Sequence, residues 1–315
     1  MIVGVALSPA LDVTYVVERL KGIQRPLETV KVAGGKALNA ARAAATVGAP
    51  RVAGVAVLAG GAGTDVAAHA REAGLELFTV EGQLPTRTCV SIFDRSTREL
   101  AEVYEHAVEV TVDEVDRALA AAVSAMAGQG GWYMLSGGLS EEHARRAVRH
   151  VKAAGGRIAL DTHSTALQAG LEEGPDLVKV NRAEAAELLG RDIGAPAAEL
   201  ASGLYECLAE IADGARAIVT DGAHGAWACD GSQVLHAPPA GSIGDYPVGS
   251  GDSFLGGLVT VLDAGGTLSD ALALATGAGV ANAQTPGAGV LDPAFARGVA
   301  SRVSVAVHAQ ASDPH

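Results

Sequence analysis

Short, continuous apolar runs alternate along most of this chain with longer alanine-rich stretches whose apolar residues recur at helical spacing. Strands that are apolar on both faces and separated by helices predict an α/β protein, with a mostly parallel sheet covered by helices on both sides. The predicted strands are 2–7, 51–59, 132–137, 157–162, 177–181 and 217–222. The predicted helices are 38–48, 64–74, 140–154, 183–189, 197–213, 251–264, 268–284 and 292–309. The first is expected to end at Gly48, and the second to open at Thr64 and close at Gly74.

Two segments, 12–33 and 87–105, break this rhythm because they alternate apolar and polar residues around charged turns. Such alternation predicts half-exposed antiparallel strands. Since both segments interrupt the α/β pattern, we expect them to form one small sheet that projects from the main body. The predicted organisation is a core of residues 1–11, 34–86 and 106–315, with a small sheet of residues 12–33 and 87–105.

Composition narrows the range of partners and compartments. The net charge is −13 at pH 7 and no long basic run occurs, so we expect neither nucleic acid nor an anionic membrane as a partner. No apolar run approaches the ~20 residues that a membrane-spanning helix needs. The cysteines, Cys89, Cys207 and Cys229, are scattered, which suits a reducing compartment. The opening MIVGVALSPALDVTY lacks the basic start of a signal peptide, so we expect a cytoplasmic protein.

The segment PVGSGDSFLGG (247–257) places Gly249, Ser250 and Gly251 where a loop meets a predicted helix. Glycines there let backbone N–H groups turn inward, and the helix N-terminus adds positive potential, so together they form a cradle for phosphate oxygens. A carboxylate beside such a cradle, here Asp252, makes sense as the base that takes a proton from an attacking hydroxyl, which is the arrangement of a kinase. An ordinary turn with a helix cap explains the same residues, and both interpretations stay open.

A second glycine segment, AGGKALNAARAAATVGA (33–49), precedes another predicted helix. Gly34 and Gly35 permit a ligand to approach the backbone, while Lys36 and Asn39 offer a cation and an amide to polyol or phosphate oxygens. A simple turn with a solvated lysine is the alternative. The usual nucleotide fingerprints, the P-loop and the Gly-x-Gly-x-x-Gly turn after a strand, do not occur, and neither does a zinc-type Cys/His cluster.

Two further strand ends carry polar groups. In LVKVNRAEAAELLG (177–190), Asn181 and Glu184 could orient water on Mg²⁺ or form a capping box, and their spacing fits both. In IVTDGAHGAWA (218–228), a strand runs into a glycine turn suited to a bound adenosine, and Asn282 could line the same place. Taken singly, turn and core roles also explain these features.

Taken together and in this order, these segments resemble the ribokinase-like, or PfkB, family of carbohydrate kinases over nearly the whole chain. AGGKALNAARAAATVGA resembles the N-terminal glycine signature, and PVGSGDSFLGG resembles the C-terminal signature with Ser250 in place of alanine. VKVNRAEAAELLG, LSGGLS and VTDGAHGA are similar to three further family segments. The resemblance implies a ribokinase-like three-layer α/β/α core, a β-sheet lid formed by 12–33 and 87–105 that makes a homodimer interface in several members, and a requirement for ATP and Mg²⁺.

The resemblance also implies a role for each matching residue. Asp252 matches the catalytic base, and Gly249, Ser250 and Gly251 match the anion hole for the transferred phosphoryl group. The positions that hold sugar hydroxyls are Asp12, Gly34, Gly35 and Asn39. Asn181 and Glu184 match the pair that organises Mg²⁺, Glu184 through water. The adenine-nucleotide region comprises Lys179, Asn181, Thr220, Gly222, Gly225 and Asn282.

Within the family, the branch that phosphorylates sugar phosphates fits best. SPALDVT resembles the opening of 1-phosphofructokinases and tagatose-6-phosphate kinases, and Arg25, Lys36 and Arg87 match their basic positions. Three cations converging on one pocket suit a substrate that already bears a phosphate dianion, although ordinary surface exposure would also explain the two arginines. The expected reaction is ATP-dependent phosphorylation of fructose 1-phosphate at O6, giving fructose 1,6-bisphosphate.

Other substrates and one other class of function stay open. Tagatose 6-phosphate and fructose 6-phosphate, both phosphorylated at O1, are the next candidates. A non-catalytic sugar-phosphate sensor is the alternative of a different class, and the intact Gly-Ser-Gly-Asp argues against it because a sensor needs no base. Ser8, Ala37, Val180, GGLS (137–140) and VYEHAVE (103–109) depart from the family pattern, which leaves the identity of the sugar open.

Overall fold

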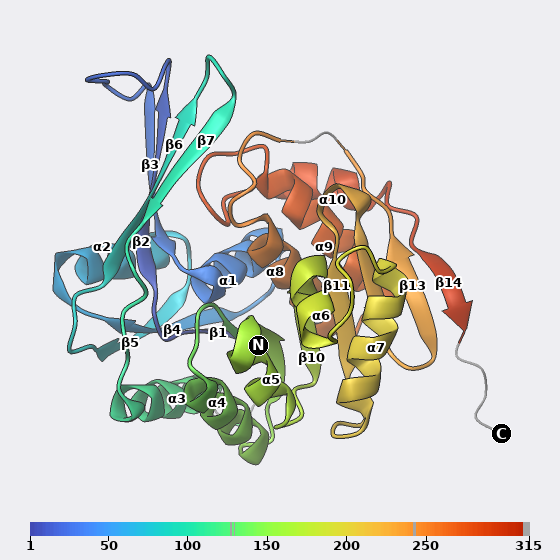
Figure 1. The fold of residues 1–315 in the computed structure, drawn as a ribbon. Helices are drawn as coiled ribbons and strands as arrows, with labels where there is room; N and C mark the ends of the chain where they lie inside the picture. Colours follow the sequence, from blue (N-terminus) through green and yellow to red (C-terminus); the bar gives the residue numbers. More distant parts are fainter. Residues whose placement is uncertain (127, 129, 242–243, 311–315) are drawn as a thin grey trace.

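One large sheet of ten strands forms the centre of the molecule (Figure 1). The computed structural model describes residues 1–126, 128, 130–241 and 244–310. The strands are β1 (Ile2–Ala6), β4 (Val52–Leu58), β5 (Glu76–Glu81), β8 (Trp132–Ser136), β9 (Arg157–Asp161), β10 (Leu177–Asn181), β11 (Arg216–Thr220), β12 (Ala226–Cys229), β13 (Gln233–Ala237) and β14 (Ala306–Gln310). Their order is β14-β13-β12-β11-β10-β9-β8-β1-β4-β5. Neighbours from β5 to β11 run parallel, and the remaining pairs are antiparallel.

Helices pack on both faces of this sheet, which confirms the predicted three layers. One face carries α3 (Val112–Met126), α4 (Glu141–Ala153), α5 (Ser164–Leu171), α6 (Arg182–Leu188) and α7 (Ala197–Ala209). The other carries α1 (Lys36–Val47), α2 (Gly60–Glu72), α8 (Ser250–Asp263), α9 (Leu268–Asn282) and α10 (Pro293–Ala300). Alternate residues of β1 serve the two layers, because Val3 and Val5 join the first core while Ile2 and Ala6 join the second. Within the described residues, no helix has the length and apolar character needed to cross a bilayer.

Small residues let α1 and α8 pack closely against each other. A side chain at Gly256 of α8 would place its Cβ only 2.4 Å from the Ala40 carbonyl oxygen of α1. The backbones therefore meet where both helices are made of glycine and alanine. This contact brings together the N-terminal turns of two helices that lie more than 200 residues apart in sequence, with Asn39 and Asp252 separated by 213 positions.

A separate sheet of four strands projects from the main body (Figure 1). Its strands are β2 (Ala10–Val17), β3 (Glu28–Gly34), β6 (Arg87–Asp94) and β7 (Glu99–Tyr104), and their order is β3-β2-β6-β7. Each hairpin is antiparallel, as predicted, but β2 and β6 pair in parallel. The purely antiparallel expectation is wrong at this seam because both hairpins leave the core in the same direction.

Three predicted helix bounds are wrong by four residues or more. The predicted helix 197–213 ends at Ala209. Helix α2 begins at Gly60 instead of Thr64, and the Thr64 hydroxyl donates to the Gly60 carbonyl within the first turn instead of capping it. The predicted helix 292–309 ends at Ala300, and β14 follows it as an edge strand beside β13. Strands β5, β12 and β13 and helices α3 and α5 are not among the predicted elements. Residues 311–315 of the predicted core lie outside the described residues.

Candidate active site

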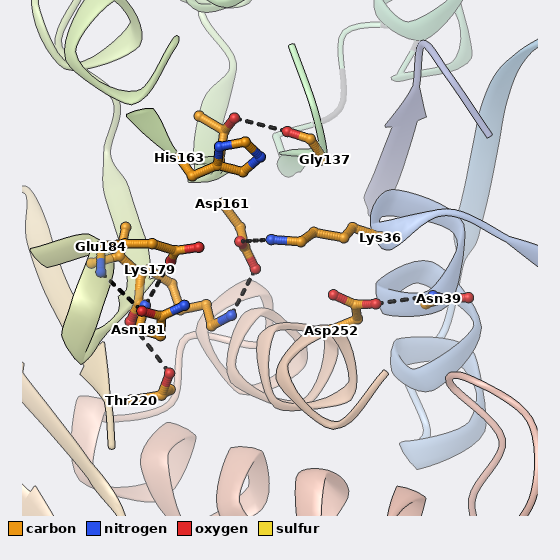
Figure 2. A network of polar contacts seen from close by, with 12 residues as sticks. Lys36, Asn39, Gly137, Asp161, His163, Lys179, Asn181, Glu184, Thr220 and Asp252 are labelled. Carbon is orange, nitrogen blue, oxygen red and sulfur yellow. Dashed lines mark hydrogen bonds and ion pairs between the residues drawn. The ribbon is translucent and has the colours of Figure 1, made fainter. Parts of the chain in front are cut away.

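Polar side chains gather at the edge of the large sheet where its parallel strands end. The last residues of β8, β9, β10 and β11 are Ser136, Asp161, Asn181 and Thr220. The N-terminal turns of α1 and α8 face the same edge and bring Lys36, Asn39 and Asp252 to it (Figure 2). Ligands of open α/β sheets bind beyond the carboxyl ends of the strands, so this edge is the candidate site.

Asp161 lies at the centre of this edge between two lysines (Figure 2). Lys36 Nζ lies 3.0 Å from its Oδ1 and Lys179 Nζ lies 2.7 Å from its Oδ2, while the carboxylate itself is fully buried. Burial alone would raise the pKa of Asp161, but the two ammonium groups hold it below its usual range. Asp161 is not among the predicted site residues; its only signal in the sequence is a carboxylate at the end of an apolar strand.

Asp252 lies in the first turn of α8, only 8% exposed. Asn39 Nδ2 donates a 2.9 Å hydrogen bond to its Oδ2 (Figure 2). Burial raises the pKa of Asp252, as does the negative charge of Asp161, while the Asn39 hydrogen bond and the two lysine charges oppose the rise. The carboxyl therefore has the character of a proton acceptor poised closer to neutral pH than an ordinary aspartate.

The turn before α8 has the form of an anion cradle. Gly249 adopts φ +83°, and a Cβ there would lie 2.7 Å from the Gly289 nitrogen, so the position requires glycine. In the part of the chain that the structure describes, the backbone N–H groups of Gly251 and Asp252 have no hydrogen-bond acceptor. Lys179 Nζ points at the same turn, 3.1 Å from where a Cβ on Gly251 would lie. Two free N–H donors and an ammonium group thus face one spot at a helix N-terminus.

A cavity of about 130 Å³ opens beside Lys36. Arg87 of β6 and Ser136 of β8 line it as well, and both the Arg87 Nε and the Ser136 Oγ are buried without a hydrogen-bond partner in the described structure. Buried polar atoms seldom stay unpaired in a native protein, so a ligand with acceptor oxygens would complete this cavity. Arg25 does not join it, because the residue is exposed in the loop between β2 and β3; the predicted convergence of three cations is not formed within one chain.

The residues predicted for the nucleotide fall into two places. Asn181 and Thr220 are register partners at the ends of β10 and β11, and the glycine turn follows directly, with Gly222 at φ +52° and Gly225 at φ +92°. Asn282 lies elsewhere and is fully buried.

The side chain of Asn282 forms hydrogen bonds to residues in and next to the anion cradle. Its Nδ2 donates to the carbonyl of Val248 and to the Ser250 hydroxyl, and its Oδ1 accepts from the Gly289 N–H. The hydrogen-bonding groups of the Asn282 side chain are thus used inside the protein, and its contact with a nucleotide stays a prediction.

The polar residues at this sheet edge agree with the results of comparing the chain with known protein families and structures. A model described as "pfkB family carbohydrate kinase" matches residues 4–294. This chain belongs to that family. Its fold is similar to that of Escherichia coli phosphofructokinase-2, solved in complex with potassium. The TM-score is 0.84 and the identity 22%, over 95% of this chain and 97% of that one. A Thermotoga maritima protein described as a possible 1-phosphofructokinase matches with a TM-score of 0.81 and 18% identity over 98% and 99% of the two chains.

Membership confirms the resemblance read from the two glycine signatures, and the protein is an ATP-dependent sugar kinase. The capping-box interpretation of Asn181 and Glu184 is also confirmed in this pfkB-family kinase. Asn181 Oδ1 accepts from the Glu184 N–H at 2.9 Å, and Glu184 Oε2 accepts from the Asn181 N–H at 2.8 Å. Oε1 of Glu184 is left for another partner.

Proposed function

We propose that this kinase transfers the γ-phosphoryl group of ATP to O6 of fructose 1-phosphate, giving fructose 1,6-bisphosphate and ADP. The observation that carries the proposal is the cavity lined by Lys36, Arg87 and Ser136, with its two unpaired buried donors. A neutral sugar would bring no negative charge to Arg87, and Lys36 already shares the single charge of Asp161 with Lys179, whereas a phosphate dianion would accept hydrogen bonds from all three lining side chains. The cavity thus supports a phosphorylated sugar as the substrate, and the proposed class is a hexose monophosphate.

The chemistry follows from the position of Asp252. Its carboxylate accepts the proton of the acceptor hydroxyl as that oxygen attacks the γ-phosphorus, and the bond from the phosphorus to the β-phosphate bridging oxygen breaks to release ADP. The N–H groups of Gly251 and Asp252 bind the equatorial oxygens of the group in transfer, and Lys179 adds a positive charge beside them. Asp12 would hold hydroxyl groups of the acceptor sugar.

The donor set at the ends of the strands fits Mg²⁺ held mainly by the nucleotide. Among the described residues, no group of three or more His, Cys, Asp or Glu side chains could form a protein cage. Mg²⁺ usually keeps several waters and takes one or two carboxylates together with substrate phosphates. Glu184, with one carboxylate oxygen fixed by the capping box and the other left over, would hold such an ion through water. Bound there with ATP, the ion would neutralise charge on the phosphates.

Which sugar phosphate is used depends on the same cavity. Ser8, Ala37 and Gly138, at which the sequence departs from the family pattern, all line it. The Ser8 hydroxyl accepts from the Val108 N–H and so anchors the segment that leaves β7. The Escherichia coli relative has been solved with fructose 6-phosphate, and that sugar and tagatose 6-phosphate are the alternatives that share the chemistry.

We also propose that two copies associate through the small sheet, which then acts as the lid of the site. Ile23 in the β2–β3 loop is 96% exposed and Val103 on β7 is 67% exposed, which is unusual for such residues on one small element. Sedimentation velocity should show a dimer for the wild type and a weaker one for Val103→Asp. A monomeric wild type at micromolar concentration would refute the association.

The test of the reaction is ADP formation by purified protein with each of the three hexose monophosphates, with ribose and adenosine as neutral controls. We expect the highest kcat/KM with fructose 1-phosphate. Turnover only with neutral sugars would overturn the assignment of the cavity to a phosphate. Thermal stabilisation by sugar phosphates with no ADP formed under any condition would instead favour a non-catalytic sensor.

A further inference from the structure

One buried arginine close to Asp252 has no place in the proposed chemistry. Arg42 lies on α1, 5% exposed, one helical turn after Asn39. Its Nη1 donates to the Ala33 carbonyl at 2.7 Å, and its Nη2 donates to Asn39 Oδ1 at 2.7 Å and also to the Ala288 carbonyl. Burying a charged guanidinium costs free energy of folding. We therefore asked what Arg42 does at this position.

The contacts of Arg42 fix which way the Asn39 amide points. A guanidinium can only donate hydrogen bonds and an ionised carboxylate can only accept them. With Arg42 on one side and Asp252 on the other, the Asn39 oxygen must face the arginine and the Asn39 nitrogen must face the aspartate, as the two distances of 2.7 and 2.9 Å show. Rotating the amide by half a turn would break both hydrogen bonds.

The same guanidinium ties the base to the anion cradle. Its Ala288 acceptor precedes Gly289, whose N–H donates to Asn282 Oδ1 at 2.6 Å. Asn282 in turn donates to the Ser250 hydroxyl in the cradle. A closed ring of contacts therefore runs from Asp252 through Asn39, Arg42, the 288–289 turn and Asn282 back to the first turn of α8.

We propose that Arg42 is a positioning residue of the phosphoryl-transfer reaction, which holds the Asn39 amide so that its N–H faces Asp252. This inference rests on the proposed role of Asp252 as the base. With the amide fixed, Asp252 Oδ2 is occupied and stabilised as an acceptor, and the second carboxylate oxygen is left for the proton of the sugar hydroxyl. The hydrogen bonds that Arg42 donates go to Ala33, Asn39 and Ala288, so its proposed role acts through Asn39.

Several other charged side chains also influence the pKa of Asp252. They are Asp12 from β2, Asp161 from β9, Lys36 from α1 and Lys179 from β10. Burial lowers the pKa of Arg42 to about 10, and the carboxylates of Asp12 and Asp252 oppose that fall, so the guanidinium stays charged at neutral pH. Without it, the Asn39 oxygen could turn toward Asp252 and favour the protonated carboxyl.

The kinetic test is the pH profile of kcat/KM for Arg42→Met. We expect the acid limb to move up by about one pH unit, which lowers kcat/KM about tenfold on the acid side, and the loss should shrink as the pH rises. The acid limb of Arg42→Lys, which keeps a hydrogen-bond donor, should lie between those of Arg42→Met and the wild type. This variant replaces Arg42→Met in the test if Arg42→Met does not fold. In an Asn39→Ala background the shift caused by Arg42→Met should be smaller.

The control for a purely structural effect is Leu200→Ala, a fully buried position on α7 on the other face of the sheet. That variant should lower the melting temperature without moving the acid limb. An unmoved acid limb in both Arg42 variants, or a shift of equal size with and without Asn39, would overturn the inference.

A second readout needs no turnover and separates this inference from the reaction itself. The ¹³C carboxyl signal of Asp252, identified by its loss in Asp252→Asn, can be titrated in the wild type and in Arg42→Met. We expect a higher pKa in the variant. If the pKa rises, and rises less in an Asn39→Ala background, but no sugar phosphate is phosphorylated, the proposed reaction fails and the positioning role stands. If turnover is present and the pKa is unchanged, the positioning role fails.

Discussion

The carboxylate of Asp12 occupies the space that a side chain on Gly34 would need. An ideal Cβ built on Gly34 would lie 2.0 Å from Asp12 Cγ, which no real structure tolerates. Gly34 is the last residue of β3 and pairs with Ala10, the first residue of β2, while Asp12 lies two residues further along β2 and pairs with Val32. Glycine at position 34 is therefore a condition for the placement of Asp12.

Gly34→Ala should displace Asp12 and raise KM for the sugar phosphate by at least about tenfold, which corresponds to 1.4 kcal/mol. The matched control is Gly61→Ala in the first turn of α2, where an added Cβ meets nothing within 4 Å. That control should leave KM unchanged and stabilise the protein slightly. Equal KM values for both variants and the wild type would contradict the role of Asp12.

Asp252→Asn should lower kcat by roughly 10²- to 10⁴-fold, because the side chain keeps its shape and loses its ability to accept the proton. The dissociation constant for ATP, measured by calorimetry, should stay close to that of the wild type. Near-normal turnover in this variant would remove Asp252 from the mechanism.

Asp161→Asn should cost about 3–5 kcal/mol of unfolding free energy, because it leaves Lys36 and Lys179 without their shared buried counter-charge. Since the folded pKa of Asp161 lies below its usual 3.8, its contribution is present above that pH and is lost as the pH falls below it. Urea denaturation at pH 7 and pH 3 measures both effects. Asp113→Asn, which removes an exposed pair with Arg117, should cost less than about 1 kcal/mol.

Arg87→Ala should raise KM for a phosphorylated sugar by about 10- to 150-fold, the equivalent of 1.5–3 kcal/mol for a hydrogen bond to a charged group, with a smaller change in kcat. Arg95→Ala is the control, since Arg95 is a largely exposed arginine near the far end of β6. A KM unchanged by the loss of Arg87 would remove the phosphate from this cavity.

Burial raises the pKa of Asp12 from 3.8 to about 6, although the charge of Arg42 opposes the rise. The folded protein therefore binds this proton more tightly than the unfolded chain, so this carboxyl lowers stability as the pH rises from 3.8 toward 6. Asp12→Asn should accordingly be more stable than the wild type at pH 8, by on the order of 1 kcal/mol for a partly solvated group. The difference should vanish near pH 4 in denaturant titrations. A variant that is less stable at pH 8 would contradict the assignment.

Local patterns in the sequence predicted much of this structure. The buried strands and their helices follow from apolar runs and helical spacing, and Gly48 ends α1 in the left-handed conformation as expected. The capping box of Asn181 and Glu184 follows from a spacing of three residues. Such features need only neighbours in the chain, which is why they can be read without coordinates.

Features that depend on distant residues escaped prediction. Asp161 is a site residue because Lys36 reaches it from 125 positions away, and nothing within RIALDT indicates that partner. Arg42 looks like one more polar position on an alanine-rich helix until the 288–289 turn closes over it. Strand β14 is fixed by its pairing with β13, whereas its own residues suit a helix as well.

The residues of the candidate site are divided between the small sheet and the main body. Asp12 and Arg87 stand on β2 and β6 of the small sheet, whereas Lys179 and Asn181 stand on β10 of the large sheet and Asp252 stands on helix α8. Tilting the small sheet about its base would move the proposed sugar-binding residues away and leave the proposed ATP-binding residues in place. With such a hinge, the enzyme would bind ATP without transferring its phosphoryl group, and binding of the sugar would bring the two parts of the site together.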